Sequence, residues 1–376
     1  MYFTNKKIFV LLSICLLILC RFKLIAQCNG FTELCSRKYN EVAYLTTHNA
    51  FNSAENNFSM PNQTYGITRQ LNDGVRALML DVYDMGGVPT VYHGSHYLGY
   101  VPLLTNLSEI KQFLDNNPNE VVSIIFESYA TADAIEEVFI QAGLTTYLYT
   151  HDIYNEWPTL QEMINNNKRL IVFSDRDDAD QGQLWYHYVW DFAVETHYSI
   201  HYADSFNCDF NRGDAQNPLF IFNHFITNNF GFGLAAEAEI INTLPFFYNR
   251  VIECQLEHNK FPNFITVDFY EKGHCIDVLN ALNQVTASIS DKVPLQGDIK
   301  IYPNPGSSEM IIELSSDNKF PYNYMLYNSN GKLIAEAQGL LSPEIVLRLS
   351  EYAEGVYHLL CRDAKGKQIT KKIIKH

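Results

Sequence analysis

From residue 42 onward, short apolar runs alternate with segments of helical periodicity, and this alternation limits the possible folds more than any other feature of the chain. Most of the runs are continuously apolar, which is typical of strands buried on both faces of a parallel sheet. The predicted strands are Val42–Thr47, Ala77–Tyr83, Thr90–His93, Val121–Glu127, Arg169–Ser174, Leu219–Phe225 and Asn263–Phe269. The predicted helices are Leu107–Asn116, Ala132–Ala142, Thr159–Asn166, Leu234–His258 and Ile276–Ser288.

This alternation over about 260 residues predicts an α/β fold, and one (β/α)8 barrel of the TIM type explains it better than two small domains. Seven strands of such a barrel can be assigned from the sequence, and the eighth cannot. An open doubly wound sheet is the alternative, although no G-x-G-x-x-G or P-loop motif supports it.

The sequence pattern changes at residues 291–298, where Pro294, Gly297 and several charges interrupt the helical periodicity. Beyond this linker, alternating strands separated by turn residues predict a small all-β sandwich over 299–376. Its predicted strands are Ile299–Tyr302, Met310–Leu314, Asn323–Tyr327, Leu333–Glu336, Ile345–Leu349, Gly355–Cys361 and Gln368–Ile374. The barrel domain is therefore expected to cover 28–290.

Residues 1–27 have the pattern of a signal peptide. Lys6 and Lys7 precede an apolar run over 8–20, and Ala26 is the small residue near the expected cleavage site. A run of thirteen residues is too short to span a bilayer, and no other apolar stretch approaches about 20, so we expect no transmembrane segment in the mature protein. A short membrane anchor and a lipoprotein acylated at Cys28 are the alternatives, although Gln27 fits a lipoprotein site poorly.

Export would place the remaining cysteines in an oxidising compartment, where disulfides form. Cys28 and Cys35 are close enough in sequence for a small disulfide loop, and Cys208 with Cys254 is a second suggested pair. The formal net charge is −15, and the acidic excess lies in 28–298. Such a charge opposes binding to nucleic acid and to anionic membrane surfaces.

Polar residues follow the predicted strands at their C-terminal ends, where the active sites of parallel barrels lie. These residues are His48, Asn49, Asp81, His93, Glu127, Asp175 and Asp268. Two histidines oriented by carboxylates suit phosphodiester cleavage, in which one takes a proton from the attacking hydroxyl and the other protonates the leaving oxygen. The reaction also needs positive charge near the phosphate, and a cation held by Asn49, Asp81 and Glu127 could supply it. Asp175 and Asp268 are predicted to bind substrate.

Two other features have ordinary structural explanations. His197 and His201 are four residues apart, a spacing that could chelate zinc on a helix, but no HExxH motif or third ligand accompanies them. A structural role is therefore predicted for this pair. The tyrosine-rich stretch 186–202 could line a lipid cleft or pack on the barrel surface.

Several motifs resemble the phosphatidylinositol-specific phospholipase C X-domain superfamily, and in particular its secreted phosphodiesterase branch in plants, fungi and bacteria. These are LTTHNAF (45–51), QLNDGVRALMLDVYD (70–84), VYHGS (91–95), FLDNNPNEVVSIIFESY (113–129), WPTLQEMI (157–164), RLIVFSD (169–175) and PNFITVDFY (262–270). The resemblance covers roughly residues 36–290. It implies a distorted (β/α)8 barrel with His48 as general base and His93 as general acid. It also implies that Asn49, Asp81 and Glu127 occupy the positions that bind Ca²⁺ in calcium-dependent members.

The chain departs from the family pattern at two points. Calcium-dependent members carry a Glu two residues before the Asp of strand two, where this chain has Met79. Metal-free bacterial members carry an Arg where this chain has Asp81, and Arg76 cannot easily replace it because it lies on the opposite face of the strand. A weak Ca²⁺ site with three protein ligands is therefore predicted.

The C-terminal region resembles the C-terminal sorting domain of type IX secretion. The motifs are IYPNP (301–305), LYNSNGKLI (326–334), GVYHLL (355–360) and KKIIKH (371–376). The resemblance implies outer-membrane translocation by that machinery, often with removal of the tail and attachment to the cell surface. A generic carbohydrate- or surface-binding sandwich is the alternative.

The sequence thus predicts a secreted phosphoric diester hydrolase that acts on a phospholipid or a glycerophospho-ester. A non-catalytic binding module that kept the barrel is a second hypothesis, which Met79 favours and the two histidines oppose. A glycerophosphodiester phosphodiesterase is a third. That family opens with His-Arg and a Glu-x-Asp pair, and Thr47-His48-Asn49 and Met79-Leu80-Asp81 do not match it.

Overall fold

A computed structural model of the chain describes residues 27–179, 182–229, 231–244, 246–283, 299–313, 322–328, 333–340, 342, 344–362 and 368–376. Residues 1–26 of the predicted signal peptide and the predicted linker 291–298 lie outside these ranges. Within the described ranges, no helix is both long and apolar enough to cross a bilayer.

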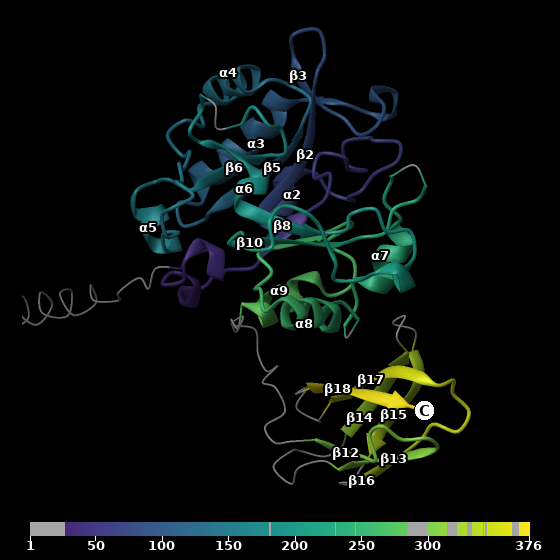
Figure 1. Cartoon of the computed structure of the whole chain (residues 1–376). Helices are drawn as coiled ribbons and strands as arrows, with labels where there is room; N and C mark the ends of the chain where they lie inside the picture. The colour runs from purple at the N-terminus through teal and green to yellow at the C-terminus, as the bar shows by residue number, and fades with distance from the viewer. Residues whose placement is uncertain are drawn as a thin grey trace, which may run out of the picture.

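Parallel strands of the first unit curl into a barrel that is open on one side (Figure 1). They are β1 (Tyr44–Thr47), β2 (Ala77–Asp84), β5 (Val122–Ser128), β6 (Leu170–Ser174), β7 (Tyr186–Tyr188), β8 (Ala193–Thr196), β10 (Leu219–His224) and β11 (Phe264–Val267). They pair in the order β7-β6-β5-β2-β1-β11-β10-β8, and the antiparallel β9 (Phe210–Arg212) extends the edge at β8. Among the described strands β7 and β8 do not pair, so the ring does not close. The predicted distorted barrel is confirmed.

Each barrel strand packs against two cores, which explains the continuous apolar runs in the sequence. In β5, Ile124 and Phe126 join the core shared with the helices, whereas Ile125 joins the core inside the barrel. In β10, Phe222 joins the core shared with the helices and Ile221 joins the core inside the barrel. Because side chains alternate along a strand, one set of alternate residues points into the barrel interior along its whole length.

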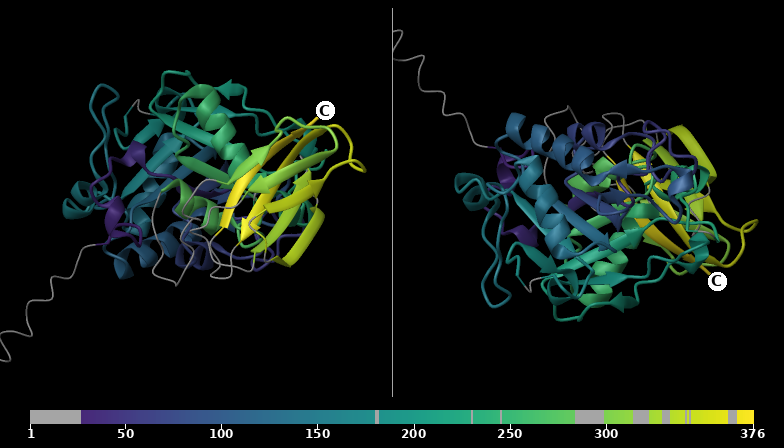
Figure 2. Two further views of the ribbon diagram at one scale, coloured as in Figure 1. Left: turned by 90° about the horizontal axis from the view of Figure 1, so that it is seen from below. Right: turned by 90° about the horizontal axis from the view of Figure 1, so that it is seen from above.

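Most of the helices cover the outside of the barrel (Figures 1 and 2). The helices are α2 (Ile67–Asn72), α3 (Leu103–Asn116), α4 (Ala132–Ala142), α5 (Leu160–Asn165), α6 (Val189–Phe192), α7 (Ala235–Ile241), α8 (Phe246–His258) and α9 (Cys275–Leu282). The buried residues of α5 and α6 instead belong to the interior core. The sequence marks the ends of α4, because the hydroxyl of Thr131 accepts from the amide of Ala134 and Gly143 takes the left-handed conformation with φ +70°. The expectation of one helix over 234–258 is wrong: α7 ends before Asn242, whose side-chain amide donates to the backbone oxygen of Asp268.

The predicted third barrel strand is also wrong. β3 (Pro89–Val91) pairs antiparallel with β2 and with the short β4 (Val101–Pro102), so it belongs to a hairpin rather than to the parallel barrel. The hairpin turn contains Gly86 and Gly87, with φ +66° and +88°, and positive φ at both central residues is what a tight two-residue turn requires. His93 therefore reaches the barrel rim on the segment that follows a hairpin strand.

Antiparallel strands form the second unit, over residues 299–376. One sheet has the order β12 (Lys300–Tyr302), β13 (Glu309–Glu313), β16 (Glu344–Arg348), and the other has the order β15 (Leu333–Leu340), β14 (Tyr322–Asn328), β17 (Gly355–Arg362), β18 (Gln368–Lys375). Met310, Leu347 and Leu359 are among the buried residues of a core that belongs to this unit alone. All seven predicted strands are present, and the predicted sandwich is confirmed.

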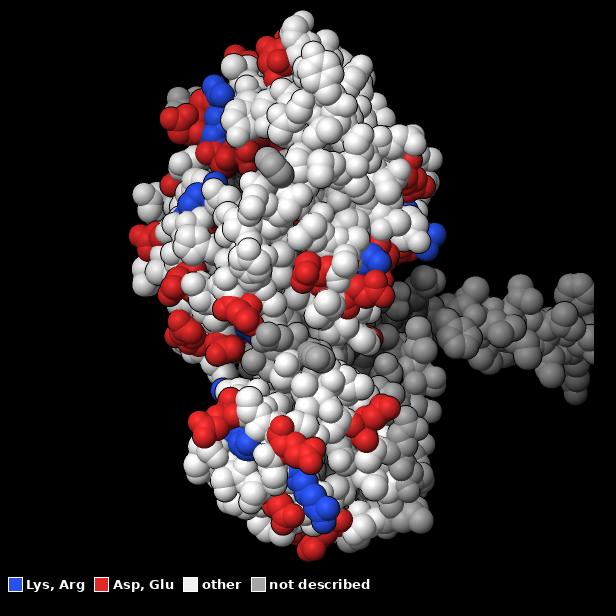
Figure 3. All heavy atoms as spheres, turned by 90° about the vertical axis from the view of Figure 1, so that its right-hand side faces the viewer, with Lys and Arg blue, Asp and Glu red and all other residues white. Residues whose placement is uncertain are grey.

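Both suggested disulfides are present. Cys28 is bonded to Cys35, and Cys208 is bonded to Cys254 of α8. On the molecular face drawn in Figure 3, Asp and Glu side chains are widely spread, and the Lys and Arg side chains of the described residues form no continuous patch. This distribution agrees with the net charge of −15.

Candidate functional site

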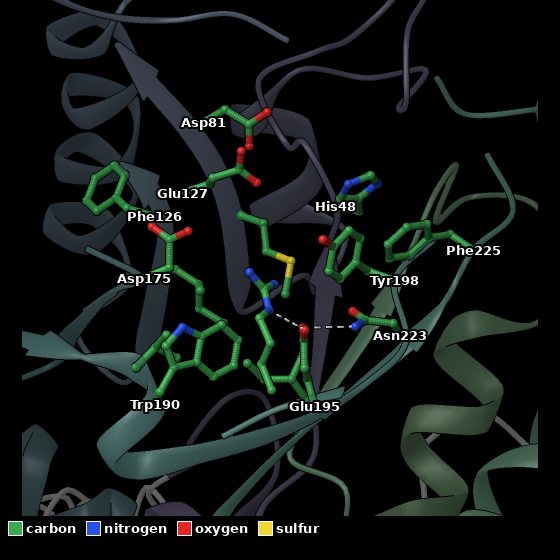
Figure 4. Close-up of a pocket in the computed structure, with 15 residues that line it drawn as sticks. His48, Asp81, Phe126, Glu127, Asp175, Trp190, Glu195, Tyr198, Asn223 and Phe225 are labelled. Carbon is green, nitrogen blue, oxygen red and sulfur yellow. Dashed lines mark hydrogen bonds and ion pairs between the residues drawn. The ribbon is translucent and has the colours of Figure 1, made fainter. Parts of the chain in front are cut away.

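The interior-facing positions of the barrel strands change from apolar to polar at their C-terminal ends. In β2 the interior series is Ala77, Met79 and Asp81. The polar residues at the ends of the corresponding series are His48, Asp81, Glu127, Asp175, Glu195, Asn223 and Asp268. All of them except Asp268 line one pocket at this end of the barrel (Figure 4). The strands therefore bring together side chains that are far apart in the sequence.

His48 is held by a carboxylate and by an aromatic ring. Its Nδ1 donates to Oδ1 of Asp268 at 2.9 Å, and the Asp268 carboxylate is almost completely buried. The imidazole stacks on Phe225 with ring centroids 4.0 Å apart and an interplanar angle of 8°. These contacts fix the ring plane and occupy Nδ1, so Nε2 is the nitrogen available for proton transfer.

His93 has an equivalent partner on a different strand. Its Nδ1 donates to Oδ2 of Asp81 at 2.9 Å, and Phe232 packs edge-on against the ring at 5.2 Å. Burial lowers the pKa of His93, but the hydrogen bond and charge of Asp81 and the charge of Glu127 outweigh burial, so the pKa is raised above 6.5. The centroids of the His48 and His93 rings are 6.5 Å apart.

Asn49 lies between the two histidines. Its φ of +47° is uncommon outside glycine, although Asn tolerates this region better than most residues. In one orientation of its amide, Nδ2 donates to the two oxygens of Asp81 at 2.9 and 3.1 Å, and Oδ1 accepts from Nδ1 of His93 at 3.2 Å. In this orientation Oδ1 also lies 3.3 Å from Nε2 of His48, from which it can accept only when that nitrogen is protonated. Asn49 therefore contacts both histidines and one of their carboxylates.

Asp81 and Glu127 are paired residues on the neighbouring strands β2 and β5, and their carboxylates point toward each other (Figure 4). Burial and then the charge of Asp81 raise the pKa of Glu127, while the hydroxyl of Tyr129, which donates to Glu127 at 2.6 Å, opposes that rise. Two facing carboxylates fit a hard cation such as Ca²⁺. Asn49 could join them only with its amide rotated, because its oxygen faces the histidines.

Met79 and Arg76 were named above because the chain differs there from the family pattern, and the structure places both. Met79 lines the pocket beside Asp81, as predicted from strand parity. Arg76 donates to Glu120 at 2.7 Å and to the backbone oxygens of Leu71 and Val75, which are outside the pocket. In the described part of the chain, no group of three or more His, Cys, Asp or Glu residues is arranged to hold a metal ion.

Sequence reasoning missed two charged residues of the pocket, Glu195 and Arg212. The Nε of Arg212 donates to Oε1 of Glu195 at 2.6 Å, and its guanidinium lies 4.4 Å from the ring centroid of Trp190 and 4.7 Å from that of Tyr198. Glu195 is buried and also accepts from Asn223 at 3.2 Å. Side chains alternate between the two faces of a strand, so Glu195 could have been assigned to the barrel interior if the four-residue strand β8 had been recognised. Arg212 lies on the edge strand β9, and no pattern in the sequence places its side chain in the pocket.

The two predicted substrate ligands occupy different positions. Asp175 lines the pocket, accepts from the amide of Ser128 at 2.9 Å, and has its pKa raised by burial. Asp268 lies behind His48, where its carboxylate contacts His48 and Asn62. Its role as a substrate ligand stays a prediction. Away from the pocket, His201 donates through Nδ1 to the backbone oxygen of Thr227 at 2.8 Å.

Residues 34–283 match the family model described as PI-PLC X 1. The chain belongs to the PI-PLC X family. A PI-PLC X domain-containing protein of Arabidopsis thaliana is 29% identical over 271 residues, which cover 65% of this chain and 62% of that protein. An uncharacterized secreted protein of Arthroderma benhamiae is 28% identical over 294 residues, which cover 69% of this chain and 64% of that protein. The chain thus spans less than two thirds of the length of these two relatives.

Among solved structures, the phosphatidylinositol-specific phospholipase C of Listeria monocytogenes aligns with this PI-PLC X chain at 16% identity and a TM-score of 0.47. The alignment covers 67% of this chain and 96% of the Listeria protein. Residues 300–376 match the model of the secretion system C-terminal sorting domain. The predicted export by type IX secretion is confirmed by this match.

Proposed function

We propose that this PI-PLC X family member is a secreted phosphoric diester hydrolase that cleaves a phospholipid-type or glycerophospho-ester bond. The observation that carries the proposal is the pair of histidines, with ring centroids 6.5 Å apart and each with its Nδ1 hydrogen bonded to a carboxylate. One small group between the two rings could interact with both of them. Membership of the family supports the same reaction class.

His48 would act as the general base. A hydroxyl, from water or from the substrate itself, attacks the phosphorus atom and gives its proton to Nε2 of His48. Asp268 holds the opposite nitrogen in its protonated form and stabilises the imidazolium that results. Phe225 keeps the ring from rotating away.

His93 would act as the general acid. It donates a proton to the oxygen that leaves the phosphorus, so that the leaving group departs as an alcohol. Asp81 orients the ring and favours its protonated form, which is the form that an acid needs at the start of the reaction.

Positive charge near the phosphate would come from Ca²⁺, which Asp81, Glu127 and a rotated Asn49 would hold. When bound, the cation would neutralise charge on the non-bridging oxygens of the phosphate. Arg212 would add a positive charge to the pocket lining, and Arg212 and Asp175 would contact the head group.

The proposal is tested by incubating the purified protein with a panel of phospholipids and glycerophospho-esters, with added Ca²⁺ and with a chelator. Release of a phosphorylated head group, or of its cyclic phosphate, from at least one substrate is the expected result. A protein that binds a member of the panel without any turnover would instead be a non-catalytic binding module.

A further inference from the structure

Asn62 is a fully buried side chain that touches the site from behind. It lies on the segment between β1 and α2 and is not among the pocket-lining residues. Its Nδ2 donates to both oxygens of Asp268, at 3.2 and 3.1 Å, and its Oδ1 accepts from Nδ2 of Asn52 at 2.7 Å. The amide of Asn62 is thus used at both ends.

The backbone of Asn62 also forms a hydrogen bond next to Asp268. Its backbone oxygen accepts from the amide of Phe269, the residue directly after Asp268, at 2.9 Å. Phe269 has a φ of +47°, which is unusual for a bulky side chain and persists only where neighbouring contacts impose it. Asn62 therefore holds both the carboxylate of Asp268 and the turn of the chain that presents it.

The segment that contains Gly233 packs against the side chains of Asn62 and Asp268. A Cβ atom at Gly233 would lie 2.6 Å from Oδ2 of Asp268 and 3.0 Å from Nδ2 of Asn62, distances too short for any side chain. The segment after β10 thus packs its backbone directly against the two side chains. Two loops that are distant in sequence converge on a carboxylate that never reaches the open pocket.

We infer that Asn62 is a positioning residue for the base, and this inference rests on the proposed function. A buried carboxylate is costly unless donors satisfy it, and His48 supplies one donor to Asp268 while Asn62 supplies the others. Without Asn62, Asp268 can rotate or lose its charge, and His48 is then no longer held with Nδ1 protonated. Partners at this distance from the reacting atoms typically change activity by about 10- to 100-fold.

The test compares Asn62→Leu with a matched control, Asn263→Leu. Asn263 is equally buried, lies at the opposite end of β11, and makes structural hydrogen bonds to Asn40, Val42 and Phe220. Both variants lose buried hydrogen bonds, so both are expected to melt at a lower temperature. Only Asn62→Leu is expected to lower kcat, by about 10- to 100-fold, with KM within about twofold of wild type because Asn62 is outside the pocket. A folded Asn62→Leu protein with wild-type kcat would overturn the inference.

Two further arms make every outcome decisive. If Asn62→Leu does not fold, Asn62→Ala replaces it, because it removes the same donor to Asp268 and introduces only a small side chain. A drop in kcat supports the inference, and an unchanged kcat overturns it.

If the wild type cleaves no phosphodiester, the proposed function fails, and the inference is then tested by proton NMR of the His48 Nδ1–H signal. The signal is assigned by its absence in His48→Gln. Its loss or upfield shift in Asn62→Leu supports the inference, and an unchanged signal overturns it.

Discussion

Each of the two site histidines uses Nδ1 for a carboxylate, and the two carboxylates differ in their surroundings. Asp268 is enclosed behind His48, so it can only orient that ring. Asp81 faces Glu127 and is bonded to His93, so one carboxylate would serve both the proposed general acid and the proposed cation site. We therefore expect a substitution of Asp81 to alter both the proposed acid and the proposed cation site.

The cation proposal leads to a prediction at Met79. This side chain points to the same side of β2 as Asp81, so Met79→Glu would add a third carboxylate to the pocket. We expect the wild type to bind Ca²⁺ weakly, with Kd of about 10⁻⁴–10⁻³ M, and Met79→Glu to bind it about ten times more tightly. Isothermal titration with Ca²⁺ measures both values, and Met79→Gln is the control without the charge. The site would be rejected if neither wild type nor Met79→Glu bound Ca²⁺.

Strand alternation decided which site residues could be found from the sequence. His48, Asp81, Glu127 and Asp175 follow long apolar runs, so their positions at the strand ends were predictable. Asn62 and Arg212 were not predictable in this way, because one lies on an irregular loop and the other on a three-residue edge strand. Their contacts depend on the tertiary fold, which local periodicity does not encode.

At the scale of elements, the fold was predicted correctly, but single elements were missed or misassigned where strands are short or a turn was overlooked. β7 and β8 have three and four residues, too few for a periodic pattern, so the tyrosine-rich stretch hid the missing barrel strands. The Gly86-Gly87 pair is a hairpin signal that places β3 antiparallel to β2. The seven strands of the sandwich were predictable because they alternate clearly between turn residues.

β7 also gives a prediction about pH. His187 is buried, donates through Nδ1 to the backbone oxygen of Val172 at 2.9 Å, and accepts at Nε2 from the amide of His151 at 3.0 Å. Burial lowers its pKa from 6.5 to about 4. The unfolded chain therefore takes up this proton first as the pH falls, and the folded state loses up to about 1.4 kcal/mol per pH unit between pH 6.5 and about 4.

Urea unfolding at about pH 7 and about pH 5 measures this effect. His187→Gln keeps an acceptor for the His151 amide without a titrating group, so its stability should fall less between the two values than that of wild type. Equal pH dependence in both proteins would show that His187 is not the group responsible.

At the scale of the whole molecule, the barrel and the sandwich have separate apolar cores. A domain with its own core can fold alone. We therefore expect a chain that ends near Val293 to keep the melting temperature of the barrel and the kcat/KM of the full-length protein. Calorimetry and the phosphodiesterase assay on both chains provide the measurement, and a shortened chain that failed to fold would show that the sandwich is an integral part of the barrel.

The central claim is that His48 and His93 are the base and acid of a phosphodiesterase, and kcat/KM on a cleaved substrate tests it most directly. His48→Ala and His93→Ala are each expected to lower kcat/KM by about 10²–10⁴-fold without loss of the folded barrel. His96→Ala removes a nearby histidine whose ring packs against Tyr92 and Tyr97, whereas His93 is bonded to Asp81, and this control should retain wild-type activity. Wild-type kcat/KM in either of the first two variants would contradict the account.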